Sequence, residues 1–236
     1  GIKYLRYQAI KFLKEEKKAK YKNADVASQA LAKLMKTLLV KRIDSSFHAF
    51  KESLNRFTIA TEAMTKMFAN GTVYIAPNLN VNEYVMEERE DELLTKMIAL
   101  QPTDPTIEIC SADDFIAGFA EGLQRDFEIL TELNKAWQKI EQDPKLDEFI
   151  RRLDTELLQK EINPAQKLVV FSESKETNTH IVKHLKAKGR NDVLEIHSDN
   201  RDKLKQTIRE NFDANIPTIQ YKNDFNIIIA TEVLAE

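Results

Sequence analysis

The spacing of hydrophobic positions changes once along the chain. Up to residue 162, apolar side chains recur at three- and four-residue intervals, which is typical of amphipathic helices. From Lys167 onward, short runs of Val, Ile and Leu alternate with amphipathic stretches, a pattern typical of parallel strands joined by helices. Asn163-Pro164 marks the change, because a residue that precedes proline disfavours helical backbone. The pattern therefore predicts two regions, 1–163 and 164–236.

The first region is predicted to be a bundle-like set of antiparallel helices. Capping residues and helix stop signals divide it, and a short strand-like segment, Thr72–Ala76, interrupts it. In chain order, the predicted helices run from Ser45 or Ser46 to Asn70-Gly71, over Val85–Ile98, from Ser111 to Ile140, and from Asp143-Pro144 to Leu157.

The second region is predicted to be a small α/β domain. Its strands are expected at 168–171, 193–197 and 225–231, with a helix that ends at Gly189 and another capped by Asp199-Asn200. Parallel sheets bind ligands at the carboxyl ends of their strands. Three polar segments follow the predicted strands: Ser172-Glu173-Ser174, His197-Ser198-Asp199 and Thr231-Glu232.

Charge is segregated along the 236 residues. The net charge is −3, but residues 1–57 carry +9 and residues 83–163 carry −12. A basic block of this size can contact phosphates, in which case weak, salt-sensitive binding to nucleic acid is expected, or it can dock on the acidic segment. Both interpretations stay open.

The sequence contains one cysteine, Cys110, and no apolar run near the roughly 20 residues that cross a bilayer. An internal disulfide and a cysteine-based zinc cluster are therefore excluded, and we expect no membrane partner and a cytoplasmic location. The chain begins Gly1-Ile2-Lys3 without an initiator Met, which favours an internal segment of a longer protein.

Few side chains form a recognisable catalytic or metal-binding pattern. His180 and His184 are four residues apart on a predicted helix, but Ile181 stands where a zinc protease has glutamate, and no third ligand is evident. We therefore predict a solvated helix face and no metal site. Ser174 lacks the Gly-x-Ser-x-Gly elbow of a nucleophile and, by its position, is expected to cap the next helix.

Three sequence stretches carry a resemblance to a known family. KLVVFSES, LEIHSDN followed by RDKLKQTIRENFDAN, and FNIIIATEVLAE occur in the order and spacing of the second RecA-like lobe of superfamily-two helicases and Swi/Snf-related translocases, which residues 167–236 resemble. LLVKRIDSSFHAFKESL resembles the segment that connects the two lobes in bacterial Swi/Snf-related helicases. The resemblance implies a helical inter-lobe insert followed by a truncated RecA-like domain, the second lobe of a P-loop NTPase fold.

The resemblance also assigns candidate site residues. KLVVFSES is similar to motif IV, and IIIATEVLAE is similar to motif V up to the point where the family continues with a glycine. By this resemblance, positions that lie near or contact the nucleic-acid backbone are occupied by Ser172, Ser174 and Thr231. Arg201 matches the arginine that opens the helix after the second strand. Glu232 matches a position toward the nucleotide cleft.

The motifs that hydrolyse ATP are absent from this chain. It has no Gly-x-x-x-x-Gly-Lys-Ser/Thr loop, no DExx box and no QxxGRxxR motif. The resemblance thus implies an ATP-dependent helicase whose other lobe binds ATP and Mg²⁺, while this fragment alone is inactive. Its implied partners are nucleic acid, with DNA favoured, and the first RecA-like lobe.

Alternative functions remain. A non-enzymatic helical interaction module fused to a small α/β domain is the main one. A dinucleotide-binding enzyme is disfavoured because no Gly-rich turn follows the first strand. Because only three strands are evident, an exposed sheet edge or apolar face is also expected, and with it self-association.

Overall fold

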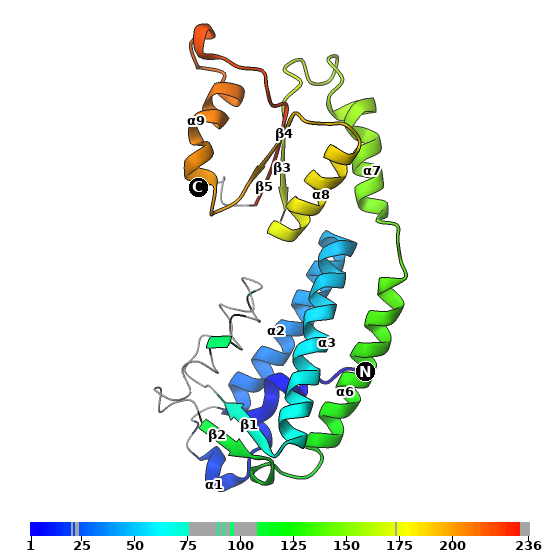
Figure 1. The fold of residues 1–236 in the computed structure, drawn as a ribbon, viewed down its shortest axis with the longest axis vertical. Helices are drawn as coiled ribbons and strands as arrows, with labels where there is room; N and C mark the ends of the chain where they lie inside the picture. Colours follow the sequence, from blue (N-terminus) through cyan, green and yellow to red (C-terminus); the bar gives the residue numbers. More distant parts are fainter. Residues whose placement is uncertain are drawn as a thin grey trace. The chain divides into compact units, whose positions relative to one another are not determined.

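The computed structural model describes residues 1–19, 21, 24–75, 89, 92, 95–96, 108–172 and 174–231. The chain is mixed α/β and divides into two compact units (Figure 1). The helical unit comprises Gly1–Lys41 and Lys51–Ile140, and the sheet unit comprises Arg42–Phe50 and Glu141–Glu236. The predicted change of pattern at Asn163-Pro164 lies inside the sheet unit.

Helices form most of the described part of the helical unit, and two of them, α2 and α3, extend into the sheet unit. Ser46 Oγ accepts a hydrogen bond from the Ala49 backbone N–H, which confirms the predicted cap of α3, and Gly71 follows the helix with a left-handed φ of 82°. The elements are η1 (Leu5–Phe12), α1 (Glu15–Lys18), α2 (Ala24–Ser45), α3 (Phe47–Ala69), β1 (Thr72–Ile75), β2 (Glu108–Ser111), η2 (Ala112–Asp114) and α6 (Phe119–Gln138).

Two predictions for this unit need correction. Ser111 does form a capping box with Asp114, but the box opens only the short helix η2. Helix α6 begins later, at Phe119, because the backbone at Phe115 is extended and pairs with Leu13. Strand β2 was not predicted; it pairs antiparallel with β1. The predicted helix over Val85–Ile98 lies almost wholly outside the described residues.

The core of the helical unit joins the amino terminus to α6. Phe115 and Phe119 stack at 4.8 Å between ring centroids, within an apolar cluster that includes Leu5 and Leu123. The buried Asp126 carboxylate of α6 accepts hydrogen bonds from the backbone N–H groups of Lys3 and Leu5, at 2.7 and 2.8 Å. This carboxylate therefore fixes the first residues of the chain on α6.

The sheet unit is built on three parallel strands in the order β3-β5-β4. Helices α8 and α9 lie on opposite sides of this sheet (Figure 1). The α8 face also packs against η3 through Leu153 and against α7 through Phe149 and Ile150. The elements are α7 (Pro144–Arg152), η3 (Leu153–Leu157), β3 (Leu168–Ser172), α8 (Lys175–Ala187), β4 (Val193–Ile196), α9 (Arg201–Phe212), η4 (Thr218–Gln220) and β5 (Ile227–Thr231).

All three predicted strands are confirmed, and Asp143 and Gly189 bound α7 and α8 as expected. The predicted cap of α9 by Asn200 is wrong. It precedes α9, but its side chain bonds back to His197 N and Glu195 O instead of capping the helix. No helix in the described part of the chain is both long and apolar enough to cross a membrane.

Strand β3 lies at an edge of the sheet and has one incompletely covered face. Its residues alternate between partly buried and exposed, and Val169 and Phe171 are 43% and 51% exposed. Helix α9 packs against the β4 and β5 residues on this side. The expected uncovered apolar surface is therefore present.

Candidate functional site

The parallel sheet brings two predicted site residues side by side. Ser172 ends β3 and Thr231 ends β5, and their Cα atoms are partners in the strand pairing. Arg201 opens α9 shortly after β4 ends, so it belongs to the same edge of the sheet. Sequence positions up to 59 residues apart thus meet at the carboxyl ends of parallel strands, where such sheets bind ligands.

Ser174 and Ser172 are engaged in local structure. Ser174, buried to 4% exposure, caps α8 by accepting a hydrogen bond from Thr177 N at 3.1 Å, as its position predicted. Ser172 Oγ lies 2.9 Å from Ser174 O and 2.7 Å from Asn178 Oδ1. A serine hydroxyl has one proton, so it can donate fully to only one of these two acceptors.

Asn178 is the unusual member of this group. Its side chain is fully buried, yet Nδ2 has no hydrogen-bond partner among the residues that the structure describes. Turning the amide over would let Nδ2 donate to Ser172 Oγ and free the hydroxyl proton for Ser174 O. In either orientation one polar atom of Asn178 stays without a partner beneath the carboxyl end of β3.

Thr231 differs from both serines. It is only partly buried, and its hydroxyl makes no hydrogen bond with the described part of the chain. Of the predicted backbone-binding residues, it has the hydroxyl most available to a ligand. Glu232 lies outside the described residues.

The loops after β3 and β4 are tied together by an exposed ion pair. Lys175 Nζ lies 2.7 Å from Asp199 Oδ2. The hydrogen bond and the charge of Lys175 lower the pKa of Asp199. His197 faces the same carboxylate, with Nδ1 3.5 Å from Asp199 Oδ2, and this buried nitrogen makes no hydrogen bond within the described part of the chain. The sequence placed His197 in the polar segment after its strand, but it gave no signal for Asn178, whose burial depends on how α8 packs on the sheet.

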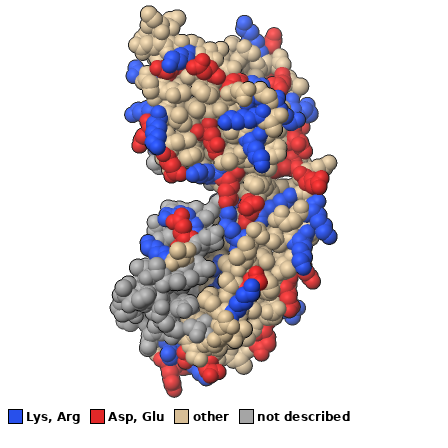
Figure 2. Space-filling model, in the orientation of Figure 1, with Lys and Arg blue, Asp and Glu red and all other residues tan. Residues whose placement is uncertain are grey.

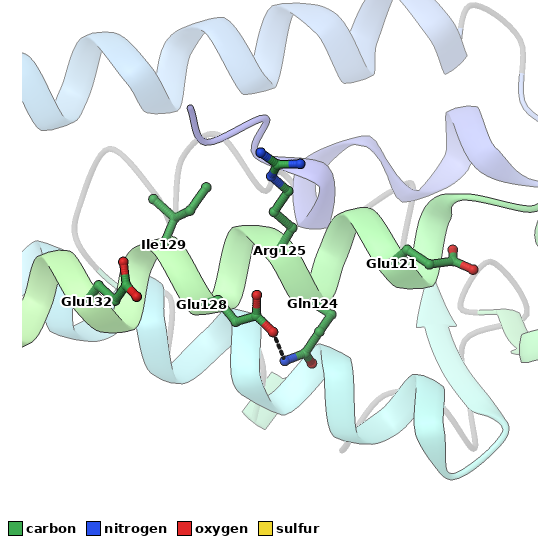
Figure 3. A pocket seen from close by; sticks show the side chains of 6 residues that line it. All are labelled: Glu121, Gln124, Arg125, Glu128, Ile129 and Glu132. Atoms are coloured by element: carbon green, nitrogen blue, oxygen red, sulfur yellow. Dashed lines mark hydrogen bonds between the residues drawn. The ribbon is translucent and has the colours of Figure 1, made fainter.

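Two hollows lie elsewhere. One, of about 540 Å³, follows the solvated face of α6 in the helical unit, where the drawn side chains all come from one helix (Figure 3). Gln124 donates to Glu128 there, and the acidic side chains are exposed. The other, of about 300 Å³, lies at the amino end of the parallel sheet, between Asp154, Arg190 and Asn226.

Charges of both signs are interspersed on the face of the molecule shown in Figure 2. Part of the basic amino-terminal block contacts the acidic segment: Lys17 Nζ lies 3.5 Å from Asp114 Oδ2. That contact supports the docking interpretation for this lysine. No group of three potential metal ligands is positioned to hold an ion among the described residues.

No protein-family model, curated protein or solved structure matches this chain. The functional argument therefore rests on the sheet edge itself, which brings together polar groups from three strand ends and leaves the Thr231 hydroxyl without a hydrogen bond to any described residue.

Proposed function

We propose that the sheet unit binds the sugar-phosphate backbone of nucleic acid, with DNA favoured, as part of an ATP-dependent helicase or translocase. The pairing of Ser172 with Thr231 at two neighbouring strand ends carries the proposal, because both strands resemble the motifs of that family. On this proposal the sheet unit is a RecA-like second lobe. ATP and Mg²⁺ are held with the help of a first lobe, and this chain alone does not hydrolyse ATP.

The chemistry of the sheet edge supports this assignment. A hydroxyl at a strand end can donate to a phosphate oxygen without reading the base sequence, which suits a protein that moves along nucleic acid. Ser174 and Ser172 support the loop that leads into α8, whereas Thr231 supplies the direct contact. Arg201, at the start of α9, adds a positive charge to the same edge.

Fluorescence anisotropy tests the proposal with labelled single-stranded DNA, duplex DNA and RNA of one sequence, each over a salt series. Thr231→Val keeps the shape of the side chain and removes its hydroxyl. We expect it to weaken binding by about threefold to tenfold, the value of one hydrogen bond, and equally for different base sequences.

Thr218→Val is the matched control. Thr218 is exposed in η4, which precedes β5 and therefore belongs to the opposite end of the sheet. The Thr218→Val variant should bind nucleic acid with the same affinity as the unmodified protein. Equal loss in both variants, or no binding at low salt, would contradict the proposal.

A second function is favoured by the exposed side chains of Val169 and Phe171 on β3. An uncovered apolar edge strand pairs readily with another protein, as expected for an interaction module. Static light scattering measures this directly. Concentration-dependent association that Phe171→Lys abolishes would support it, and a strictly monomeric protein at high concentration would argue against it.

A further inference from the structure

Three of the four histidines lie together in the sheet unit. His48 is the second residue of α3, and His180 and His184 are one turn apart on α8. The His48 and His180 rings stack at 4.1 Å between centroids with an interplanar angle of 9°, and the His184 ring lies 4.3 Å from that of His180. His184 Nδ1 hydrogen-bonds with the His180 carbonyl oxygen at 2.9 Å.

The segment that carries His48 is packed into the sheet unit. This segment, Arg42–Phe50, is termed the α2–α3 turn. Ala49 and Phe50 are 0% and 6% exposed. Lys145 of α7 donates a hydrogen bond to the carbonyl oxygen of Asp44 at 2.8 Å. Asp44 lies in the last turn of α2, which ends at Ser45. The turn is therefore held by the hydrogen bond from Lys145 and by the stacked imidazoles.

Stacking of this kind requires that the rings stay neutral. Two protonated imidazoles at van der Waals distance repel each other, and partial burial removes the water that would screen the repulsion. The charged groups that act on His180 are His48 from α3, His184 and Lys183 from α8, and Asp143 at the start of α7. Asp143 alone favours the protonated form.

Burial, followed by the influence of His48 and His184, lowers the pKa of His180 from 6.5 to about 4. A released ring regains the ordinary value, so the released state binds a proton more tightly than the seated state. The seated state is therefore fully favoured above pH 6.5 and loses stability progressively as the pH falls toward 4.

We propose that His48, His180 and His184 form an acid-sensitive latch, which holds the α2–α3 turn on α8 through the stacked neutral rings and releases it when His180 is protonated. The latch is independent of the proposed nucleic-acid contact, because none of its residues lies at a strand end of the sheet. Histidine suits such a latch because an unperturbed imidazole gains or loses its charge close to neutral pH.

Hydrogen exchange of the backbone amides in the α2–α3 turn tests the latch. Rates are measured by NMR on the full chain with EDTA present and expressed as protection factors, which correct for the intrinsic effect of pH. Between pH 7.5 and 5.5 the protection factors should fall by up to about tenfold. At pH 5.5 a released His180, with its ordinary pKa of 6.5, is mostly protonated, whereas a seated His180, with a pKa of about 4, is not. Unchanged protection would overturn the proposal.

Two substitutions by phenylalanine test whether His180 causes the acid-dependent loss of protection. His180→Phe keeps a planar ring against His48 but cannot be protonated, and it should abolish the acid response. His197→Phe changes the one histidine outside the cluster and should retain the response. An acid response that survives in His180→Phe would overturn the proposal.

The histidine rings provide a second measurement if His180→Phe does not fold. In the unmodified protein, the NMR resonances of the seated His180 ring should titrate with a midpoint near pH 4. A midpoint at or above 6.5 would overturn the latch. These measurements do not depend on nucleic acid.

Discussion

The two ends of the parallel sheet differ in how completely their polar side chains are hydrogen-bonded. At the amino end, Lys167 Nζ reaches Asn223 Oδ1 at 2.8 Å and Asn226 Oδ1 at 3.1 Å, and Asp192 accepts from both Arg190 and Asn226. At the carboxyl end, Asn178 Nδ2 and His197 Nδ1 are buried, and neither they nor the Thr231 hydroxyl makes a hydrogen bond with the described residues.

This difference separates polar groups that hold the fold from those available for binding. Buried polar atoms are almost always hydrogen-bonded, so unpaired ones point to strain or function. The contrast is sharpest between two asparagines. Asn211 is 1% exposed and bonds with Thr207 O, Asp224 N and Phe225 N, whereas Asn178 is 0% exposed and has an unpaired Nδ2.

The largest expected effect comes from Asn211→Leu. The substitution keeps the branched shape of the side chain but leaves the partly buried N–H groups of Asp224 and Phe225 without their acceptor. We expect the free energy of unfolding to fall by about 3 kcal/mol. Urea denaturation followed by circular dichroism measures it. Asn215→Leu, at an exposed position beyond α9, is the control, and an equal loss there would refute the assignment.

Asp192→Asn is expected to have an intermediate, pH-dependent effect. Burial alone would raise the pKa of Asp192, but the hydrogen bonds of Arg190 and Asn226 and the charge of Arg190 outweigh it and lower this pKa. The carboxylate thus stabilises the fold above pH 3.8, and this contribution is lost as the pH falls through the lowered folded-state value.

At pH 7, Asp192→Asn should cost about 1.5 kcal/mol, the value of a hydrogen bond to a charged group. The difference from the unmodified protein should shrink progressively as the pH falls below 3.8 and through the lowered folded-state pKa of Asp192. Urea denaturation over a pH series measures the difference. Asp224→Asn, at an exposed position, is the control; an equal loss of stability there at pH 7 would show that the network at the amino end is not the cause.

The smallest effect is expected from Asn178→Leu. It removes the acceptor nearest to Ser172 Oγ but also removes a buried donor that has no partner, and Ser172 can still donate to Ser174 O. The change in unfolding free energy should be less than about 1 kcal/mol. A loss as large as that of Asn211→Leu would erase the distinction between the two ends.

Local patterns predicted most elements of the sheet unit. The runs that became β3, β4 and β5 are rich in Val, Ile and Leu, and β5 is buried on both faces, so its sequence has little polar alternation to obscure the strand. The caps of α3, α7 and α8 were predicted because a capping side chain bonds within three residues.

Non-local contacts account for what sequence patterns missed. Strand β2 is only four residues long, and its partner β1 precedes it by more than 30 positions. Helix α6 starts late because Phe115 pairs with Leu13, about 100 residues away. At the candidate site, strand order decides which loops meet, so the neighbourhood of Ser172 and Thr231 could be proposed, but the unpaired Asn178 amide could not.

The interleaved composition of the two units has a consequence for synthesis. His48 and the rest of the α2–α3 turn leave the ribosome 132 residues before His180, against which that turn must pack. At ordinary elongation rates the delay is on the order of ten seconds. During that interval His48 lacks the imidazole on which it later stacks, so the turn is synthesised well before the strands of the unit that contains it.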